Sequence, residues 1–86
     1  MTQDAPAVHV VEVLGPGCQK CLYVESVIRE VVERAGLAVE IRHLTDYREI
    51  AARGVMSTPA IAVDGTVVLA GRVPTRGQVA AWLGIE

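Results

Sequence analysis

An abrupt change of residue pattern at Gly15-Pro16-Gly17 sets the architecture of this chain. Before it, Val8 to Leu14 is a nearly continuous apolar run rich in β-branched residues, which predicts a central strand covered on both faces. After it, from Cys18 to Ala35, apolar residues recur with the period of a helix, and Gly36 follows as a C-terminal cap. The chain therefore opens with a strand that leads directly into a long helix.

The next two segments repeat this order on a smaller scale. Residues 37–43 alternate apolar and polar side chains, which predicts a half-covered strand near a sheet edge. Asp46 and Glu49 have the spacing of a capping box, so a short helix is expected through about Arg53, closed by Gly54.

A hairpin and a last helix complete the pattern. Ala60–Val63 and Thr66–Ala70 read as short strands joined by Asp64-Gly65, a strong hairpin signal. Thr75 and Gln78 form a second capping-box pattern. The inner face of the helix that follows is expected to carry Val79, Trp82 and Leu83.

These elements give the order β-α-β-α-β-β-α. The first strand-helix-strand unit must cross over right-handedly, so its two strands are parallel, while the hairpin adds an antiparallel pair. The sequence therefore predicts an α/β fold with one mixed four-stranded sheet and helices on both faces. With 86 residues the chain is expected to form a single domain, 1–86, in which residues 1–6 are a flexible tail.

Composition and charge exclude several function classes. The formal net charge is -2 and the basic residues are not clustered, so we expect no nucleic-acid partner. No apolar run approaches the length of a membrane span, and the polar, acidic residues 1–6 do not resemble a signal peptide. We therefore expect a cytoplasmic monomer that is not bound to a membrane. In such a compartment cysteines are more often catalytic or metal-binding than structural.

The only two cysteines, Cys18 and Cys21, lie where the first strand gives way to the helix. Residues three apart on a helix share a face, and their separation suits a disulfide. Unpaired N–H groups and the positive dipole end at the helix N-terminus favour a thiolate, and Lys20 adds a positive charge. We expect Cys18 to be the exposed attacking thiolate and Cys21 the buried resolving partner, with no bound cofactor.

Two other uses of this pair stay open. A structural disulfide across so short a loop would constrain the unfolded chain by only about 2 kcal/mol, and a cytosolic setting would reduce it. Binding or transfer of a soft metal such as copper through two thiolates is the alternative function. Copper chaperones, however, have the order β-α-β-β-α-β, without a second helix before the hairpin. A closed zinc site needs four ligands and would have to add both His9 and His43, but His9 lies near the far end of the first strand from Cys18. We expect no metal site.

Three motifs in the chain resemble those of the small archaeal and bacterial thioredoxin-like redox proteins. They are residues 13–21 (Val-Leu-Gly-Pro-Gly-Cys-Gln-Lys-Cys), 54–60 (Gly-Val-Met-Ser-Thr-Pro-Ala) and 71–74 (Gly-Arg-Val-Pro). The resemblance covers about Val8 to Leu83 and implies a thioredoxin-like three-layer sandwich. It also implies a thiol-disulfide oxidoreductase that acts on protein disulfides and is reduced by an external reductase.

The resemblance assigns roles to individual residues. Cys18 matches the nucleophile and Cys21 the resolving cysteine. Pro59 matches the cis-proline that faces the cysteine pair, and Thr58 would offer its backbone to a bound substrate segment. Gly17 and Gln19-Lys20 depart from ordinary thioredoxin, which has tryptophan before the nucleophile and Gly-Pro between the cysteines.

Two ionisable residues near the pair have competing interpretations. Glu12 lies six residues before Cys18, where thioredoxins hold a buried acid that shuttles a proton to the resolving cysteine. Among valines it could have a raised pKa, but we expect a carboxylate that reaches solvent at the strand end. His43 lies at the same sheet edge as the cysteines, and we expect it to be a surface or packing residue.

Overall fold

A computed structural model describes residues 9–16 and 19–85 of the chain. The element order is the one predicted. The helices and strands are β1 (His9–Leu14), α1 (Gln19–Ala35), β2 (Val39–Leu44), α2 (Tyr47–Ala52), β3 (Ala60–Val63), β4 (Thr66–Ala70) and α3 (Arg76–Trp82). Only β2 departs noticeably from its predicted bounds, since it begins at Val39 and not at Leu37. The predictions for Val8, Cys18 and the 1–6 tail lie outside the described residues.

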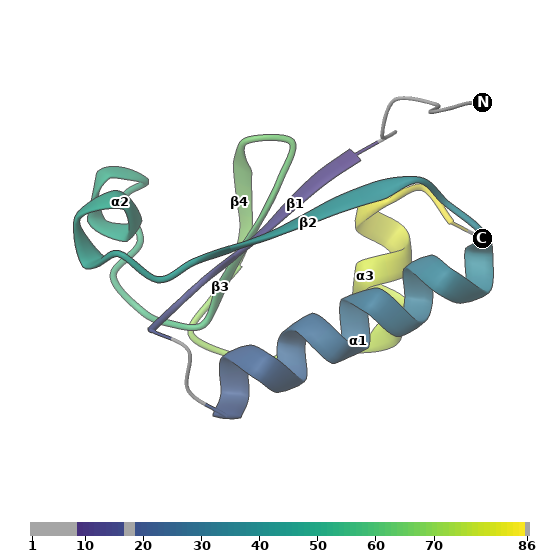
Figure 1. The fold of residues 1–86 in the computed structure, drawn as a ribbon, viewed down its shortest axis with the longest axis horizontal. Helices are drawn as coiled ribbons and strands as arrows, with labels where there is room; N and C mark the ends of the chain where they lie inside the picture. Colours follow the sequence, from purple (N-terminus) through teal and green to yellow (C-terminus); the bar gives the residue numbers. More distant parts are fainter. Residues whose placement is uncertain (1–8, 17–18, 86) are drawn as a thin grey trace.

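The four strands form one mixed sheet with the order β2-β1-β3-β4 (Figure 1). Strand β1 is parallel to β2 and antiparallel to β3, and β3 pairs antiparallel with β4. This arrangement confirms the predicted topology and places β2 at an edge. Because β1 and β2 are parallel and in register, the loops that follow them leave the sheet at the same end.

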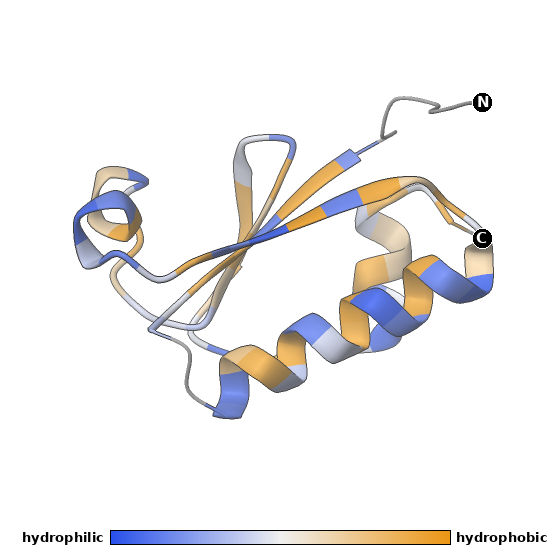
Figure 2. Ribbon diagram, viewed as in Figure 1, coloured by the Kyte–Doolittle hydropathy of each residue, from blue (hydrophilic) through white to orange (hydrophobic). Residues whose placement is uncertain are grey.

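One face of the sheet packs against α1 and α3. Helix α1 lies along the sheet with α3 beside it, and hydrophobic residues alternate with hydrophilic ones along its turns (Figures 1 and 2). Its inward side is aliphatic, which is why a chain without phenylalanine still closes a core. The buried residues of this cluster are Val11, Val13, Cys21, Val24, Val27, Ile28, Val31, Val32, Ile61, Val63, Val79 and Leu83.

The other face has a smaller core beneath α2. Its buried members are Leu14, Ile50, Val55, Ala60 and Ala62. Helix α2 has six residues and lies toward one end of the sheet (Figure 1), so it covers only part of this face. The small core explains why a charged residue of β1 can be accommodated on this side.

Local signals in the sequence produced the predicted turns and caps. Asp64 and Gly65 both have positive φ, 51° and 88°, as the tight hairpin between β3 and β4 requires. Thr75 and Gln78 form the complete capping box predicted for α3. Asp46 caps α2, but its carboxylate accepts the backbone N–H of Arg48, the second helical residue, and not the third-residue N–H of a capping box.

Candidate active site at the start of helix α1

Cys21 is placed by the first turn of α1 and is fully buried. Its sulfur lies against Gly15, the residue directly after β1, so closely that a Cβ atom built on Gly15 would be 2.3 Å from Sγ. Gly15 is held in place because its N–H donates to the carbonyl of Leu44 at 2.9 Å. Glycine is therefore required here, because any side chain would occupy the space of the sulfur.

The loop before β3 reaches the same point. The peptide bond between Thr58 and Pro59 is cis, and Pro59 is buried while Thr58 is exposed. The Cβ of Thr58 is 3.7 Å from the position that a Gly15 Cβ would take, so Thr58 and the Cys21 sulfur both lie close to this one point beside Gly15. The structure thus brings together Cys21 and the Thr58-Pro59 pair, as the sequence predicts. Cys18 lies outside the described residues.

A second glycine holds this loop. The N–H of Gly71, directly after β4, donates to the carbonyl of Pro59 at 2.9 Å. Gly71 has φ +85°, and a Cβ built on it would lie 3.1 Å from the Cβ of Ser57. Both the backbone conformation and the close approach therefore favour glycine. This gives a structural reason for the third sequence motif, residues 71–74.

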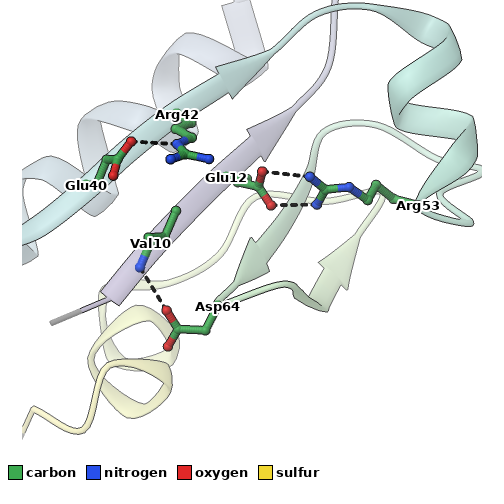
Figure 3. A network of polar contacts seen from close by, with 6 residues as sticks. All are labelled: Val10, Glu12, Glu40, Arg42, Arg53 and Asp64. Carbon is green, nitrogen blue, oxygen red and sulfur yellow. Dashed lines mark hydrogen bonds and ion pairs between the residues drawn. The ribbon is translucent and has the colours of Figure 1, made fainter. Parts of the chain in front are cut away.

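Glu12 differs from both interpretations of the sequence. Its side chain does not reach solvent, since the residue is only 6% exposed. The carboxylate instead accepts two hydrogen bonds from the guanidinium of Arg53, at 2.5 and 2.8 Å (Figure 3). Arg53 follows α2, so the ion pair joins the central strand to the end of that helix. The prediction of a solvated carboxylate was wrong because the partner lies 41 residues away along the chain.

The interpretation of Glu12 as an acid with a raised pKa is wrong as well. The hydrogen bonds from Arg53 hold the pKa of the Glu12 carboxyl below its usual value, with a further contribution from the positive charge of Arg42, and these outweigh the effect of burial. The neighbours of Glu12 along β1, Val11 and Val13, pack in the cluster that contains Cys21. Because strand residues alternate, Glu12 faces the opposite side of the sheet.

His43 lies on the α1 face of the sheet, opposite Val13 in register. Its Nδ1 is 3.5 Å from Oε1 of Glu25, on the second turn of α1. The imidazole packs between the sheet and α1, which agrees with the expectation of a packing residue. The contact with Glu25 was not predicted. The only signal for it in the sequence is that Glu25 stands four residues after Cys21 on a predicted helix.

Several large apolar side chains are exposed on the segments that form the site. Leu22 and Tyr23 follow Cys21 on α1, and Met56, two residues before Thr58, is 96% exposed. These side chains present apolar area to solvent on the two segments that carry Cys21 and Thr58.

Residues 9–16 and 19–85 contain no group of three or more His, Cys, Asp or Glu side chains arranged to hold a metal ion. Within the same ranges, none of the helices has the length and apolar character needed to cross a membrane.

Comparison with known proteins identifies the family. The family model described as thioredoxin domain matches residues 9–84 of this chain. A thioredoxin of Methanocaldococcus jannaschii is 36% identical over 70 residues, which cover 81% of this chain and 80% of that protein. A thioredoxin of Methanothermobacter thermautotrophicus is 29% identical over 69 residues, covering 80% and 90%.

A solved structure of thioredoxin-2, described as a component of the malaria parasite protein secretion machinery, shares the fold. Its TM-score is 0.65 at 17% identity, and the match covers 94% of this chain and 85% of that one. These similarities confirm the family that the three sequence motifs indicated. The chain belongs to the thioredoxin domain family.

Proposed function

We propose that this protein is a thiol-disulfide oxidoreductase that exchanges its Cys18–Cys21 dithiol with disulfides in other proteins. The observation that carries the proposal is the place of the Cys21 sulfur, which lies against Gly15 at the start of α1 with Thr58 close to the same point. This arrangement puts a cysteine sulfur beside the Thr58 backbone that is proposed to bind the substrate segment. The thioredoxins among its relatives support the same general chemistry.

The proposed reaction has two exchanges. The Cys18 thiolate attacks one sulfur of the substrate disulfide, forms a mixed disulfide and releases the other sulfur as a thiolate. Cys21 then loses its proton and attacks the Cys18 sulfur, which releases the second substrate thiol and leaves the Cys18–Cys21 disulfide. An external reductase supplies two electrons and two protons to restore the dithiol, so no bound cofactor is needed.

A protein substrate fits the surface better than a small disulfide does. The exposed side chains of Leu22, Tyr23 and Met56 would bury apolar area against a polypeptide but have little to bury against a small thiol. The backbone of Thr58, beside the Cys21 sulfur, is proposed to pair with the bound segment. We propose that the protein works as a monomer in a reducing cytoplasm.

Trapping of a mixed disulfide tests this function. A Cys21→Ser variant incubated with a disulfide-bonded test protein is expected to form a covalent adduct through Cys18, because the second exchange is blocked. Mass spectrometry identifies the linked residues, and dithiothreitol must release the adduct. A Cys18→Ser variant is the matched control and should give no adduct.

The opposite outcome favours the alternative function. Absence of an adduct with Cys21→Ser, together with copper or zinc that remains bound to the wild-type protein during dialysis against a chelator, would overturn the proposal.

A further inference from the structure

The second exchange of the proposed function needs a group that removes the proton of Cys21. In this chain Glu12 is poorly suited to that task. Its carboxylate is occupied by two hydrogen bonds from Arg53, and its pKa is lowered, so it is a weak base. It also faces the side of the sheet away from the cluster in which Cys21 packs. An acceptor on the α1 side of the sheet would be better placed.

His43 is on that side of the sheet, and the residue it contacts, Glu25, lies one helical turn from Cys21 on α1. It contacts Glu25 at 3.5 Å, and Glu25 and Cys21, four residues apart on α1, lie on neighbouring turns of one helix face. Strand β2, which carries His43, also holds Gly15 through the carbonyl of Leu44, the next residue. The imidazole therefore lies between the strand that fixes Gly15 and the helix that carries Cys21.

The two ring nitrogens of His43 have different surroundings. Nδ1 faces the Glu25 carboxylate, which favours the neutral tautomer with its proton on Nδ1. Nε2 is then a lone-pair acceptor, and it is buried without a hydrogen-bond partner among the described residues. A buried acceptor left without a partner costs stability, so its presence calls for an explanation.

The charges around His43 suit a base that becomes a cation during the reaction. From α1 it meets Glu25, whose other oxygen accepts a hydrogen bond from Arg29 at 2.8 Å. Its register partner on β1 is the apolar Val13. Arg42, the preceding residue of its own strand, faces the opposite side of the sheet, because strand residues alternate. Among the described residues, the charge that His43 meets directly is therefore negative.

We infer that His43, oriented by Glu25, is the proton acceptor for Cys21 in the second exchange. This inference rests on the proposed function. As the Cys21 sulfur attacks the Cys18 sulfur of the mixed disulfide, the thiol proton passes to Nε2, and Glu25 stabilises the imidazolium that forms. The Cys18–substrate bond breaks, and the substrate thiolate leaves. The imidazolium then gives its proton to that thiolate or to solvent, which completes the proton balance.

The test separates the two exchanges in one reaction. An aromatic disulfide whose thiol product absorbs visible light releases one equivalent when Cys18 attacks and a second when Cys21 attacks. Stopped-flow absorbance then gives both rates. His43→Asn keeps an N–H donor near Glu25 but has no base in the place of Nε2. Glu25→Gln removes the charge that orients the ring. Glu30→Gln, on the same helix and also ion-paired with arginines, is the matched control.

The expected result is specific to the second phase. His43→Asn should slow it about a hundredfold at neutral pH, as loss of a general base does, and leave the first phase within about twofold. The slowed phase should gain a tenfold dependence on each pH unit that the wild-type phase lacks, because hydroxide replaces the imidazole as the base. Glu25→Gln should give a smaller decrease, and Glu30→Gln none.

The role of His43 and the proposed exchange reaction fail through different results. A second phase in His43→Asn with the wild-type rate and pH profile would overturn the role of His43 while leaving the exchange reaction intact. Absence of a second phase in the wild-type protein would instead contradict the proposed function. Thermal unfolding of each variant identifies any general loss of structure, and equal slowing of both phases would also overturn the inference.

Discussion

The sulfur of Cys21 occupies the space that a side chain at Gly15 would need. The two residues belong to different elements, the end of β1 and the first turn of α1, and the close approach of sulfur to backbone fixes how these elements meet. Thr58 lies near the same position, 3.7 Å from where a Gly15 Cβ would be, so the loop before β3 closes on the same point. The geometry of the proposed site thus depends on a glycine, which has no side chain, at position 15.

Substitution of Gly15 by Ala tests this relationship. The new Cβ would lie 2.3 Å from Sγ, so Cys21 must move or α1 must shift, and we expect the free energy of unfolding to fall by about 1–3 kcal/mol. Urea unfolding of the reduced protein measures the loss. Gly77→Ala in α3 is the matched control, because the nearest atom to its new Cβ would be 3.9 Å away, and its stability should be unchanged or slightly raised. Equal stability of Gly15→Ala and the wild type would contradict the packing described.

The ion pair of Glu12 predicts a particular dependence of stability on pH. Because Arg53 lowers the pKa of Glu12 in the folded protein, the ion pair stabilises the fold above the ordinary value of 4.5, and this contribution is lost as the pH falls through the folded value. Glu12→Gln should therefore reduce the free energy of unfolding by about 1–2 kcal/mol at neutral pH.

The difference between Glu12→Gln and the wild type should shrink as the pH falls below 4.5. Urea unfolding at a series of pH values measures it. A difference that grows as the solution is acidified would mean that the pKa of Glu12 is raised, as in a buried proton shuttle, and would contradict the account.

The Glu12→Gln variant also tests whether Glu12 accepts the proton of Cys21. Because its carboxylate is already committed to Arg53, Glu12→Gln should leave the pH profile of the second thiol-release phase unchanged. Stopped-flow absorbance with the aromatic disulfide provides the measurement. If the variant slows this phase with a new dependence on hydroxide, Glu12 and not His43 removes the proton from Cys21.

Exposed apolar residues near the site predict a preference for protein substrates. Met56→Gln removes apolar surface from a side chain that is 96% exposed, so the fold should not change. With a disulfide-bonded protein as substrate we expect KM to rise about threefold to tenfold, because a polar amide would be buried against the substrate in place of the Met56 thioether. The rate with a small disulfide should stay the same. A parallel loss with both substrates would place Met56 in the chemistry and contradict a docking role.

Local sequence signals were sufficient for the fold but not for the ion pairs around the site. The turn at Asp64-Gly65 and the cap at Thr75 were predicted because each depends on residues within four positions of one another. Glu12 was misjudged because Arg53 reaches it from the end of α2, 41 residues away, and no periodicity shows such a contact.

Part of the site could be predicted from the sequence. Cys21 and the Thr58-Pro59 pair follow from motifs at fixed places in the chain order, and the structure brings them together at Gly15. The pairing of His43 with Glu25 needed the register of β2 against β1 and the rotation of α1 about its axis, which are properties of the packed molecule. The role of Cys18 remains a prediction.

A redox titration decides whether Cys18 and Cys21 form a reversible disulfide. The protein is equilibrated in dithiothreitol buffers of graded ratio, quenched with acid and alkylated, and its mass is measured. The account predicts a single reversible two-electron transition between a form with two alkylated cysteines and a form with none, lost when either Cys18 or Cys21 is replaced by Ser. A protein that keeps both thiols reduced under fully oxidising buffers would contradict the account.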